Sequence, residues 1–402
     1  MAKLKLLFDV EQLAVDGLKG TGIVRVCDEL LQALSNSPVI DLYLIITSDR
    51  GNFDDYLKSK NLFDKLKNKI VYLPKLKSTT KNLNLYQRLR TKVLTFIYFN
   101  KYKDVLKNYD SYISMFSPIS PVIYKSDLKT YMIIHDLIPI YYPDGCNPKF
   151  VKRFVDWMKR ASADEYFCVS EYTKKDFLKF RPDEKHKPIH TLYLGARDNF
   201  KPIKDSARLS LVKQKYGIKT QKYFLAVSEI TARKNLVHLL KSFVAFLDKT
   251  KASDISLVLV GPVRKGYDAV ANSIEGLKKY QDKIIQTGFA DEEDLAPLYS
   301  GATAFIYPSL YEGFGLPVLE AMQCGTPVIT TDNTSLPEVG GDAVLYISAK
   351  DKTETAETLN KIYSDNNLAQ KLSQKGLERA KLFSWEICVK TVENTVLKKC
   401  RE

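Results

Sequence analysis

The fold of this chain is decided by one stretch, AFIYPSLYEGFGLPVLEAM, which spans residues 304–322. Its first four residues are apolar and predict a buried strand, which a turn then ends. Gly313 and Gly315 let the backbone that follows approach a ligand closely. Pro317 favours the first turn of a helix, whose free N–H groups suit an anion. A strand, a glycine-bearing loop and a helix in this order indicate a phosphate-binding corner of a parallel α/β sheet.

The same alternation of short apolar runs with helical stretches continues along the whole chain, which favours parallel-sheet α/β domains. Strands are predicted at residues 4–10, 42–47, 70–73, 111–114, 130–135, 165–169 and 189–193, and then at 223–227, 256–260, 284–287, 304–307, 327–331 and 343–347. The polar segment 195–217 lacks a clear strand and separates the halves. We expect two α/β domains that face each other across a cleft, with ligands at the carboxyl ends of the strands.

Charge is distributed unevenly along the 402 residues, which carry a formal net charge of +14. Residues 58–107 hold fourteen Lys and Arg against only Asp64 and Asp104. Such a field attracts an anionic partner, which could be a membrane surface, a nucleic acid or a phosphorylated substrate. A basic surface that serves solubility alone explains the same charge.

Within this basic region, the segment 83–109 also carries an apolar stripe. At helical spacing, one face holds Leu85, Leu89, Val93, Phe96 and Ile97. A basic amphipathic helix of this kind can lie in the interface of an anionic bilayer. The alternative is that the stripe packs on the sheet of the first domain.

Cysteine usage and the N-terminus bear on the compartment. The six cysteines form no C-x-x-C pair and none lies near a His at metal-ligand spacing, so they indicate a reducing compartment and no metal site. The N-terminus resembles the start of a strand rather than a signal peptide, and no apolar run of about 18 residues is present. We expect a cytoplasmic protein, peripheral on the inner face of the cytoplasmic membrane if the basic region meets lipid.

A second candidate for ligand binding follows the strand predicted at 223–227. It reads Ser228-Glu229-Ile230-Thr231-Ala232-Arg233-Lys234-Asn235. Two cations at the end of a parallel strand can hold a diphosphate. On this octapeptide alone, a pair of cations exposed to solvent is the simpler interpretation.

Two weaker signals lie in the first half. The turn GLKGTGIVR, residues 17–25, would place the backbone N–H of Gly22 at a helix N-terminus, where it can contact a phosphate. His135 ends the strand predicted at 130–135, and Asp136 can orient it or cap the turn. A lone His is more often a structural residue than a ligand-binding one.

The run YEGFGLPVLEAMQCGTPVITTDNTSLPEVGGDAVLY, residues 311–346, resembles nearly throughout the donor-site region of the family-four retaining glycosyltransferases. That family includes bacterial mannosyltransferases, rhamnosyltransferases and sucrose synthases. The Thr-Gly-Ile-x-Arg segment at 21–25 resembles the corresponding segment of the mannosyl- and rhamnosyltransferases in this family that build surface polysaccharides. The resemblance is strong over 223–385, patchy over 1–200 and weakest over 49–109.

The resemblance implies a GT-B fold with two Rossmann-like domains: an acceptor-side domain at 1–200 and a nucleotide-sugar domain at 201–383. A C-terminal helix at 384–402 would pack back on the first domain. Glu312 would face the transferred sugar, and Glu320 would hold the ribose hydroxyls. The implied catalytic residues are Glu312, His135, Arg233 and Lys234. The residues implied for donor binding are Gly22, Ser228, Arg233, Lys234, Gly288, Phe289, Glu312, Gly313, Phe314, Gly315, Leu316 and Glu320.

The resemblance also implies the chemistry. The product would keep the donor's anomeric configuration, with same-face attack and no assigned nucleophile. No Asp-x-Asp follows an apolar strand, so neither a metal nor another cofactor is expected. Many relatives carry a further Arg shortly before the basic triplet, and none lies between Tyr223 and Ala232 here. One phosphate contact is therefore absent or supplied elsewhere.

We expect transfer of a hexose, by preference mannose from GDP-mannose, to a glycan or lipid-linked acceptor in bacterial surface polysaccharide (O-antigen or capsule) synthesis. A UDP- or dTDP-sugar donor carrying glucose, GlcNAc or rhamnose is the alternative. A dinucleotide-dependent oxidoreductase is disfavoured because no G-x-G-x-x-G follows the first strand. A non-catalytic sugar-nucleotide sensor or a nucleic-acid-binding protein is the rival of another class, but no nucleic-acid motif accompanies the charge.

Overall fold

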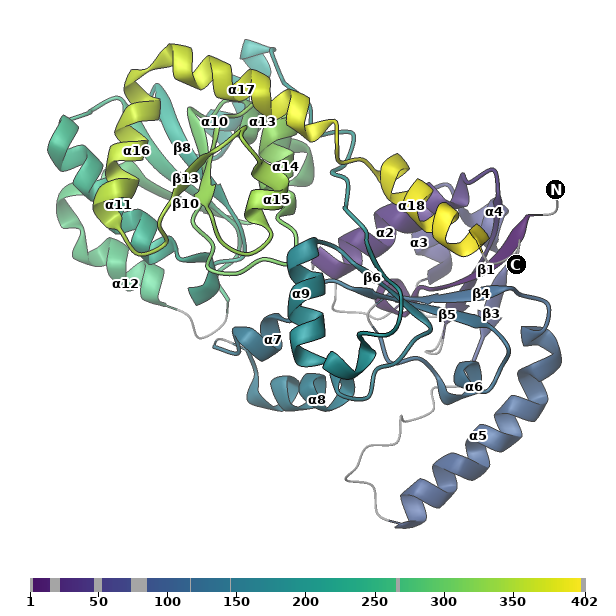
Figure 1. Ribbon diagram of the computed structural model, residues 1–402. Helices are drawn as coiled ribbons and strands as arrows, with labels where there is room; N and C mark the ends of the chain where they lie inside the picture. Colours follow the sequence, from purple (N-terminus) through teal and green to yellow (C-terminus); the bar gives the residue numbers. More distant parts are fainter. Residues whose placement is uncertain are drawn as a thin grey trace. The chain divides into compact units, whose positions relative to one another are not determined.

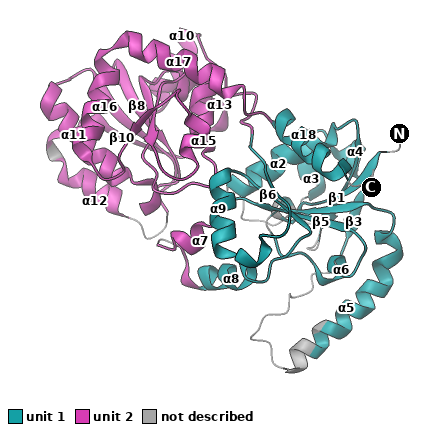
Figure 2. Cartoon of the chain, viewed as in Figure 1, with its two compact units in different colours: residues 1–135, 149–194, 385–402 teal, residues 136–148, 195–384 magenta. Residues whose placement is uncertain are grey.

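The computed structural model describes residues 3–14, 22–46, 53–73, 85–115, 117–144, 146–264 and 268–398. The chain forms two compact units (Figure 1). The first unit comprises Met1–His135, Lys149–Leu194 and Trp385–Glu402, and the second comprises Asp136–Pro148 and Gly195–Ser384 (Figure 2). The main boundary falls after Leu194, a few residues before the predicted boundary at 200, and the C-terminal helix is counted with the first unit as predicted. Asp136–Pro148 was predicted in the first domain but is counted with the second unit.

The first unit is built on a parallel sheet of seven strands in the order β3-β2-β1-β4-β5-β6-β7. These strands are β1 Leu4–Asp9, β2 Ile40–Ile46, β3 Ile70–Tyr72, β4 Ser111–Ser114, β5 Lys129–Ile134, β6 Glu165–Cys168 and β7 Ile189–Thr191. The order reverses between β1 and β4, as in doubly wound sheets. Nearly continuous burial along β1 and β5 fits a sheet covered on both faces.

Most helices of the first unit connect these strands. The helices described in this unit are α1 Glu11–Ala14, α2 Gly22–Ser35, α3 Phe53–Ser59, α4 Phe63–Leu66, α5 Leu85–Leu106, α6 Pro121–Tyr124, α8 Pro148–Met158, α9 Glu171–Phe180, the 3-10 turn η1 Pro182–Glu184 and α18 Trp385–Leu397. Helices α2 and α9 contact the sheet directly. The C-terminal helix α18 packs on α2, and Ser37 after α2 donates a 2.5 Å hydrogen bond to Glu393.

The second unit has a six-stranded parallel sheet in the order β10-β9-β8-β11-β12-β13. Its strands are β8 Lys222–Val227, β9 Ile255–Val260, β10 Ile284–Gly288, β11 Ala304–Tyr307, β12 Val328–Thr331 and β13 Leu345–Ile347. Numbered within the unit, this is the dinucleotide-fold order 3-2-1-4-5-6, with its switch point between β8 and β11. All of the strands described in the two sheets were predicted from the sequence within a few residues.

Three of the helices described in the second unit begin after a capping aspartate. The helices of this unit are α7 Ile138–Tyr141, α10 Ser206–Lys215, η2 Ala232–Lys234, α11 Leu236–Thr250, α12 Ala269–Gly276, η3 Lys278–Lys283, α13 Glu292–Ser300, α14 Leu316–Gln323, α15 Leu336–Gly340, α16 Lys352–Ser364 and α17 Asn366–Ala380. The side chains of Asp205, Asp351 and Asp365 accept backbone N–H groups at the first turns of α10, α16 and α17. The core packs α11 on β8 through edge-to-face contacts of Phe224 with Phe243 and Phe246.

The helix α5 contains the apolar stripe predicted from the sequence. Its described members Leu89, Val93, Phe96 and Ile97 are each more than half exposed. The alternative that this stripe packs on the sheet is therefore wrong. The helix instead buries its other side, where Thr95 and Leu106 are covered.

Candidate functional site

The site residues of the second unit gather where β8 and β11 end. The turn η2 follows β8 and carries Arg233 and Lys234, and the loop after β11 carries Glu312. These two strands are neighbours at the switch point of the sheet. Ligands of open α/β sheets bind at such a point, outside the carboxyl ends of the strands.

One oxygen atom of Glu312 organises this cluster. Its Oε1 accepts hydrogen bonds from Arg233 Nη1 at 2.6 Å and from Lys234 Nζ at 2.6 Å. The same atom accepts from the hydroxyls of Tyr307 at 2.9 Å and Ser309 at 2.6 Å. Arg233 Nη1 also donates to the carbonyl of Tyr311 at 2.5 Å, so the cation ties the turn η2 to the glycine-bearing loop.

The charges of this cluster are shifted by burial and by one another. Burial alone would raise the pKa of Glu312, but Arg233 and Lys234 outweigh it and lower the pKa to about 2. Burial lowers the pKa of Lys234 to about 8, although Glu312 opposes that shift. Burial also opposes the charge of Arg233, yet Glu312 keeps the pKa of Arg233 above its usual value. At neutral pH the cluster holds one carboxylate and two cations, so it keeps a net positive charge.

Glu312 lies in a loop, yet it is only 8% exposed and is therefore buried. Removing one partner of a buried ion pair leaves an uncompensated charge, which costs about 3–5 kcal/mol. The sequence pattern located the residue but did not show that its neighbours close over it.

The glycine-bearing loop is fixed by groups from the segment after β12. The hydroxyl of Ser335 donates to the carbonyls of Glu312 at 3.0 Å and Phe314 at 2.8 Å. The backbone N–H of Glu312 donates to Thr334 Oγ1 at 3.2 Å. Gly315 immediately precedes α14 with φ +114°, and a Cβ there would lie 2.9 Å from Leu336. The loop thus needs glycine at 315, and α14 begins at Leu316, next to the predicted Pro317.

The segment Asp136–Pro148 belongs to the second unit and packs against the same loop. The rings of Tyr141 and Tyr142 contact that of Tyr311, with centroids 6.4 and 5.7 Å apart. Asp136 accepts the backbone N–H of Ile138 at 2.9 Å. Burial raises the pKa of Asp136, and the charges of Arg233 and Lys234 counteract part of that rise.

Glu320 lies on α14 and is 2% exposed. Its Oε2 accepts a hydrogen bond of 3.1 Å from the hydroxyl of Tyr299, which is itself buried. The two glutamates of the sequence pattern therefore differ in their surroundings. Glu312 lies among cations, whereas the contact described for Glu320 comes from a neutral phenol.

With this geometry in view, comparison with known proteins assigns the second unit to a family. Residues 211–379 match the family model of glycosyl transferases group 1. They are a glycosyltransferase group 1 domain. The match covers both halves of the Glu312 cluster.

Curated relatives of the chain include O-antigen chain mannosyltransferase B of Escherichia coli, which is 32% identical over 259 residues. That alignment covers 63% of this chain and 66% of the relative. O-antigen chain mannosyltransferase RfbU of Salmonella typhimurium is 28% identical over 229 residues, which are 57% of this chain and 59% of the relative. Serotype-specific mannosyltransferase WbdA of Escherichia coli is 28% identical over 262 residues, 64% of this chain but only 32% of the relative. The chain thus spans one third to two thirds of these proteins.

Solved structures share the fold over nearly the whole chain. A glycosyltransferase from Rickettsia africae has a TM-score of 0.70 at 17% identity and covers 99% of both chains. Anabaena Alr3699/HepE in complex with UDP and glucose has a TM-score of 0.71 at 15% identity and covers 98% of this chain and 100% of its own. Together with the two parallel sheets, these likenesses establish the GT-B architecture.

Other predicted donor-binding residues of the glycosyltransferase domain lie at carboxyl ends of strands of the same sheet. Ser228 follows β8, and its N–H donates to the carbonyl of Val260 at 2.9 Å. Gly288 ends β10 with a positive φ, and the ring of Phe289 beside it is 73% exposed. An aromatic ring this exposed at a strand end is available for stacking.

Two predicted residues belong to the first unit. His135 directly follows β5 and is buried, and burial lowers its pKa to about 4, so the ring is neutral at neutral pH. Gly22 is the first residue of α2, as predicted, and a Cβ there would meet open space. Residues 17–21 of the predicted turn lie outside the described residues.

Asp9 was not predicted as a site residue from the sequence. It ends β1 at the switch point of the first unit and is 6% exposed. Its carboxylate accepts from the hydroxyls of Tyr112 at 3.0 Å and Ser117 at 2.6 Å, and burial raises its pKa. The one signal was its position after an apolar strand, which many structural residues share.

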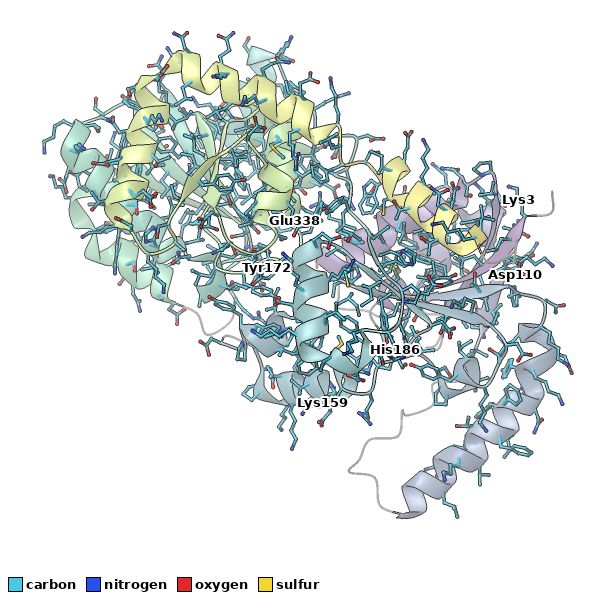
Figure 3. The ribbon with its side chains drawn as sticks, in the orientation of Figure 1. Lys3, Asp110, Lys159, Tyr172, His186 and Glu338 are labelled. Atoms are coloured by element: carbon cyan, nitrogen blue, oxygen red, sulfur yellow. The ribbon has the colours of Figure 1, made fainter. Side chains whose placement is uncertain are left out.

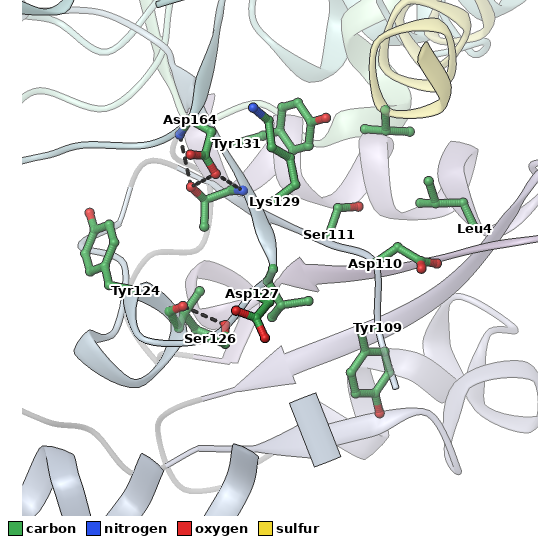
Figure 4. Close-up of a pocket in the computed structure, with 14 residues that line it drawn as sticks. Leu4, Tyr109, Asp110, Ser111, Tyr124, Ser126, Asp127, Lys129, Tyr131 and Asp164 are labelled. Atoms are coloured by element: carbon green, nitrogen blue, oxygen red, sulfur yellow. Dashed lines mark hydrogen bonds between the residues drawn. The ribbon is translucent and has the colours of Figure 1, made fainter. Parts of the chain in front are cut away.

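A hollow of about 660 Å³ lies in the first unit at the opposite, amino ends of its strands (Figure 4). Its lining includes Asp110, which precedes β4, and Ser111, the first residue of β4. Lys129 at the start of β5 and Asp164 just before β6 also line it. None of the predicted site residues contributes to it. Parallel sheets bind ligands at the carboxyl ends, so we assign no part of the donor site to this hollow.

Within the described ranges, no group of three or more His, Cys, Asp and Glu side chains is arranged to hold a metal ion. In the same part of the chain, no helix combines the length and the apolar character required to cross a bilayer.

Proposed function

We propose that this chain is a retaining hexosyltransferase that transfers mannose from GDP-mannose to a glycan or lipid-linked acceptor in bacterial surface polysaccharide synthesis. The observation that carries the proposal is the cluster of Glu312, Arg233 and Lys234 at the switch point of a glycosyltransferase group 1 domain. Mannose is favoured because O-antigen mannosyltransferases are among the relatives.

The cations have the capacity to hold the donor diphosphate. An ammonium has three N–H donors and a guanidinium has five. The described contacts of Lys234 Nζ use two donors, toward Tyr307 and Glu312. Both cations can therefore contact Glu312 and a diphosphate together, and the N-terminus of α14 adds backbone N–H groups. With a pKa of about 2, Glu312 serves as a carboxylate that orients the cations and faces the sugar, not as a proton donor.

The other predicted site residues would contact the remaining parts of the donor. The backbone of Gly313, Phe314, Gly315 and Leu316 would contact the sugar hydroxyls and the phosphates, and Glu320 would hold the ribose. Ser228 and Gly22 would lie near the phosphates, and Gly288 with Phe289 would contact the base. His135, neutral at pH 7, would donate or accept one hydrogen bond to the transferred sugar.

The reaction needs no protein nucleophile in this proposal. The bond from the anomeric carbon to the diphosphate oxygen breaks, and a bond from that carbon to the acceptor oxygen forms on the same face. The departing diphosphate takes the proton of the acceptor hydroxyl. Arg233 and Lys234 stabilise the charge that develops on the leaving group, which is the task of preorganised electrostatics. No metal or other cofactor takes part.

We also propose that the chain works at the inner face of the cytoplasmic membrane, as a peripheral protein and without nucleic acid as a partner. The net charge of +14 supports an anionic surface as a partner, because basic segments are attracted to anionic lipids. Lipid-linked acceptors would be encountered at that surface.

The test is transfer of isotope-labelled mannose from GDP-mannose to lipid-linked mannose oligosaccharides, followed by proton NMR of the product. The proposal predicts a new linkage with the anomeric configuration of the donor. An inverted linkage, or no transfer from any donor, would contradict it. Anabaena Alr3699/HepE was solved with UDP and glucose, so UDP-glucose is the first alternative donor, followed by UDP-GlcNAc and dTDP-rhamnose. Faster transfer from one of these would correct the donor and keep the reaction class.

A further inference from the structure

The outward face of α5 holds four large apolar side chains that are each more than half exposed. Leu89 is 60% exposed, Phe96 is 61%, Ile97 is 52% and Val93 is 51%. Folded proteins rarely leave such a contiguous group in water unless it contacts something. We call these four residues the α5 stripe.

The geometry of the helix explains why the stripe faces away from its own unit. Its members are spaced by four, three and one residues, which places them on one side of a helix. The opposite side holds Thr95, 5% exposed, and Leu106, 1% exposed. In Figure 1, α5 lies at the margin of the first unit, and Figure 3 shows side chains projecting along its length.

Basic side chains border the stripe on both sides. Arg90 and Lys101 follow one edge in the helical projection, Lys92 follows the other, and all three are exposed. The helix contains one acidic residue, Asp104, which pairs with Lys107 at 3.1 Å. The α5 stripe is thus an apolar strip within a positive border.

We propose that the α5 stripe and its basic border dock the chain on an anionic lipid bilayer, with the helix in the plane of the interface. The apolar side chains would enter the boundary between headgroups and acyl chains, and the cations would contact lipid phosphates. This inference rests on the proposed peripheral localisation and narrows it to one helix face.

The charge pattern distinguishes a bilayer from other occupants. A symmetric contact with a second copy would bring the same patch against itself and place cations opposite cations. A nucleic acid would engage the cations through its phosphates and would gain little from Leu89, Val93 and Ile97, which are aliphatic. An anionic bilayer uses both halves of the pattern.

The test is co-sedimentation of the full chain with vesicles of phosphatidylglycerol and phosphatidylcholine in equal parts, against vesicles of phosphatidylcholine alone. One variant replaces the stripe with Leu89→Gln, Val93→Gln, Phe96→Gln and Ile97→Gln, which keeps helix propensity. A second variant reverses charge with Arg90→Glu, Lys92→Glu and Lys101→Glu. A matched control reverses three exposed lysines of the second unit with Lys241→Glu, Lys352→Glu and Lys371→Glu.

We expect the wild type and the control to bind the anionic vesicles and not the neutral ones. Each cation near an anionic surface favours binding by about fivefold, so the charge variant should bind on the order of a hundredfold more weakly. The stripe variant should lose at least about tenfold through its lost apolar contacts. Both variants should keep the thermal midpoint and the GDP affinity of the wild type, since the changed residues are exposed and lie in the first unit.

Four results would overturn the proposal. The first is that the wild type does not bind anionic vesicles, and the second is that the control variant loses as much vesicle binding as the charge variant. The third is that the stripe variant binds vesicles as tightly as the wild type. The fourth is that the wild type forms a dimer that does not bind vesicles and that dissociates in the stripe variant. The third would make α5 a general polyanion-binding face, and the fourth would assign the stripe to a second copy. None of these depends on whether mannose is transferred, so a failure here and a failure of the proposed reaction remain distinguishable.

Discussion

Glu312 sets the charge balance at the switch point, because its Oε1 contacts both Arg233 and Lys234. The sequence allowed the three residues to be named, since each follows a strand that ends at the same edge of one sheet. Their burial could not be predicted, because it depends on Tyr307, Ser309 and the segment after β12. Those groups carry no pattern of their own.

Glu312→Ala should destabilise the chain by about 3–5 kcal/mol, because it leaves two buried cations without their counterion. Glu312→Gln keeps the shape and should cost less, and both variants should lose transfer. Chemical denaturation and the mannose-transfer assay measure the two effects. The exposed Glu275→Ala on α12 is the control and should stay within about 0.5 kcal/mol of wild type. Wild-type stability of Glu312→Ala would show that the cluster is not an ion-paired unit.

Lys234 predicts a pH dependence of nucleotide binding. Burial lowers its pKa to about 8, so the protonated form that attracts a diphosphate is lost as pH rises through that value. Affinity for GDP should therefore decline by about tenfold or more from neutral to alkaline pH, the effect of one charge-assisted contact. Lys234→Arg should shift the decline to higher pH, because a guanidinium keeps its proton there. Calorimetry across pH that shows a flat profile for wild type would contradict this role.

At the scale of elements, the strands of both sheets could be predicted because each is a short apolar run bounded by polar turns. The orientation of α5 could not be predicted in the same way. That helix has apolar residues on both sides, Leu94 and Leu106 as well as the stripe, so the pattern alone did not show which side is buried. Contacts with the rest of the first unit decide it.

The junction of β8 and β9 supplies a prediction at this scale. Gly261 has φ +132°, and a Cβ there would lie 2.0 Å from the carbonyl oxygen of Ser228. Gly261→Ala should therefore displace the segment that leads to Arg233. The backbone strain should destabilise the chain by about 1–3 kcal/mol or more. The displaced segment should also weaken GDP binding.

Gly276→Ala on α12 is the matched control for this substitution, because a Cβ there meets nothing within 4 Å. Thermal denaturation and GDP titration compare the two variants. If Gly261→Ala behaves like Gly276→Ala in both measurements, the close approach of the strand ends does not position the cation turn.

At the scale of the whole molecule, two features depend on contacts between distant parts of the sequence. Asp136–Pro148 belongs to the second unit through contacts such as Tyr142 with Tyr311, and Trp385–Glu402 belongs to the first. The resemblance implied the return of the C-terminal helix. The packing of residues 136–148 with the second unit was not predicted, because nothing in that segment indicates its packing partner.

Transfer should proceed at an unchanged rate in EDTA. In the proposed mechanism Arg233, Lys234 and the N-terminus of α14 supply the positive charge that a divalent cation supplies elsewhere. The measurement is the initial rate of mannose transfer with and without the chelator. As a control, Mg²⁺ in excess of EDTA is added back to the treated sample. A loss of activity in EDTA that Mg²⁺ restores would show that a metal holds the diphosphate.

The most direct test of the central claim is calorimetric titration of GDP into the full chain, with the wild type, Arg233→Ala, Lys234→Ala and the exposed Lys241→Ala compared in EDTA. We expect saturable binding by the wild type and by Lys241→Ala. Each of the two cluster variants should lose about tenfold or more in affinity, since each loses a charge-assisted contact worth roughly 1.5–3 kcal/mol. Wild-type affinity in both cluster variants, or no binding of any nucleoside diphosphate by the wild type, would contradict the assignment of this cluster as the donor site.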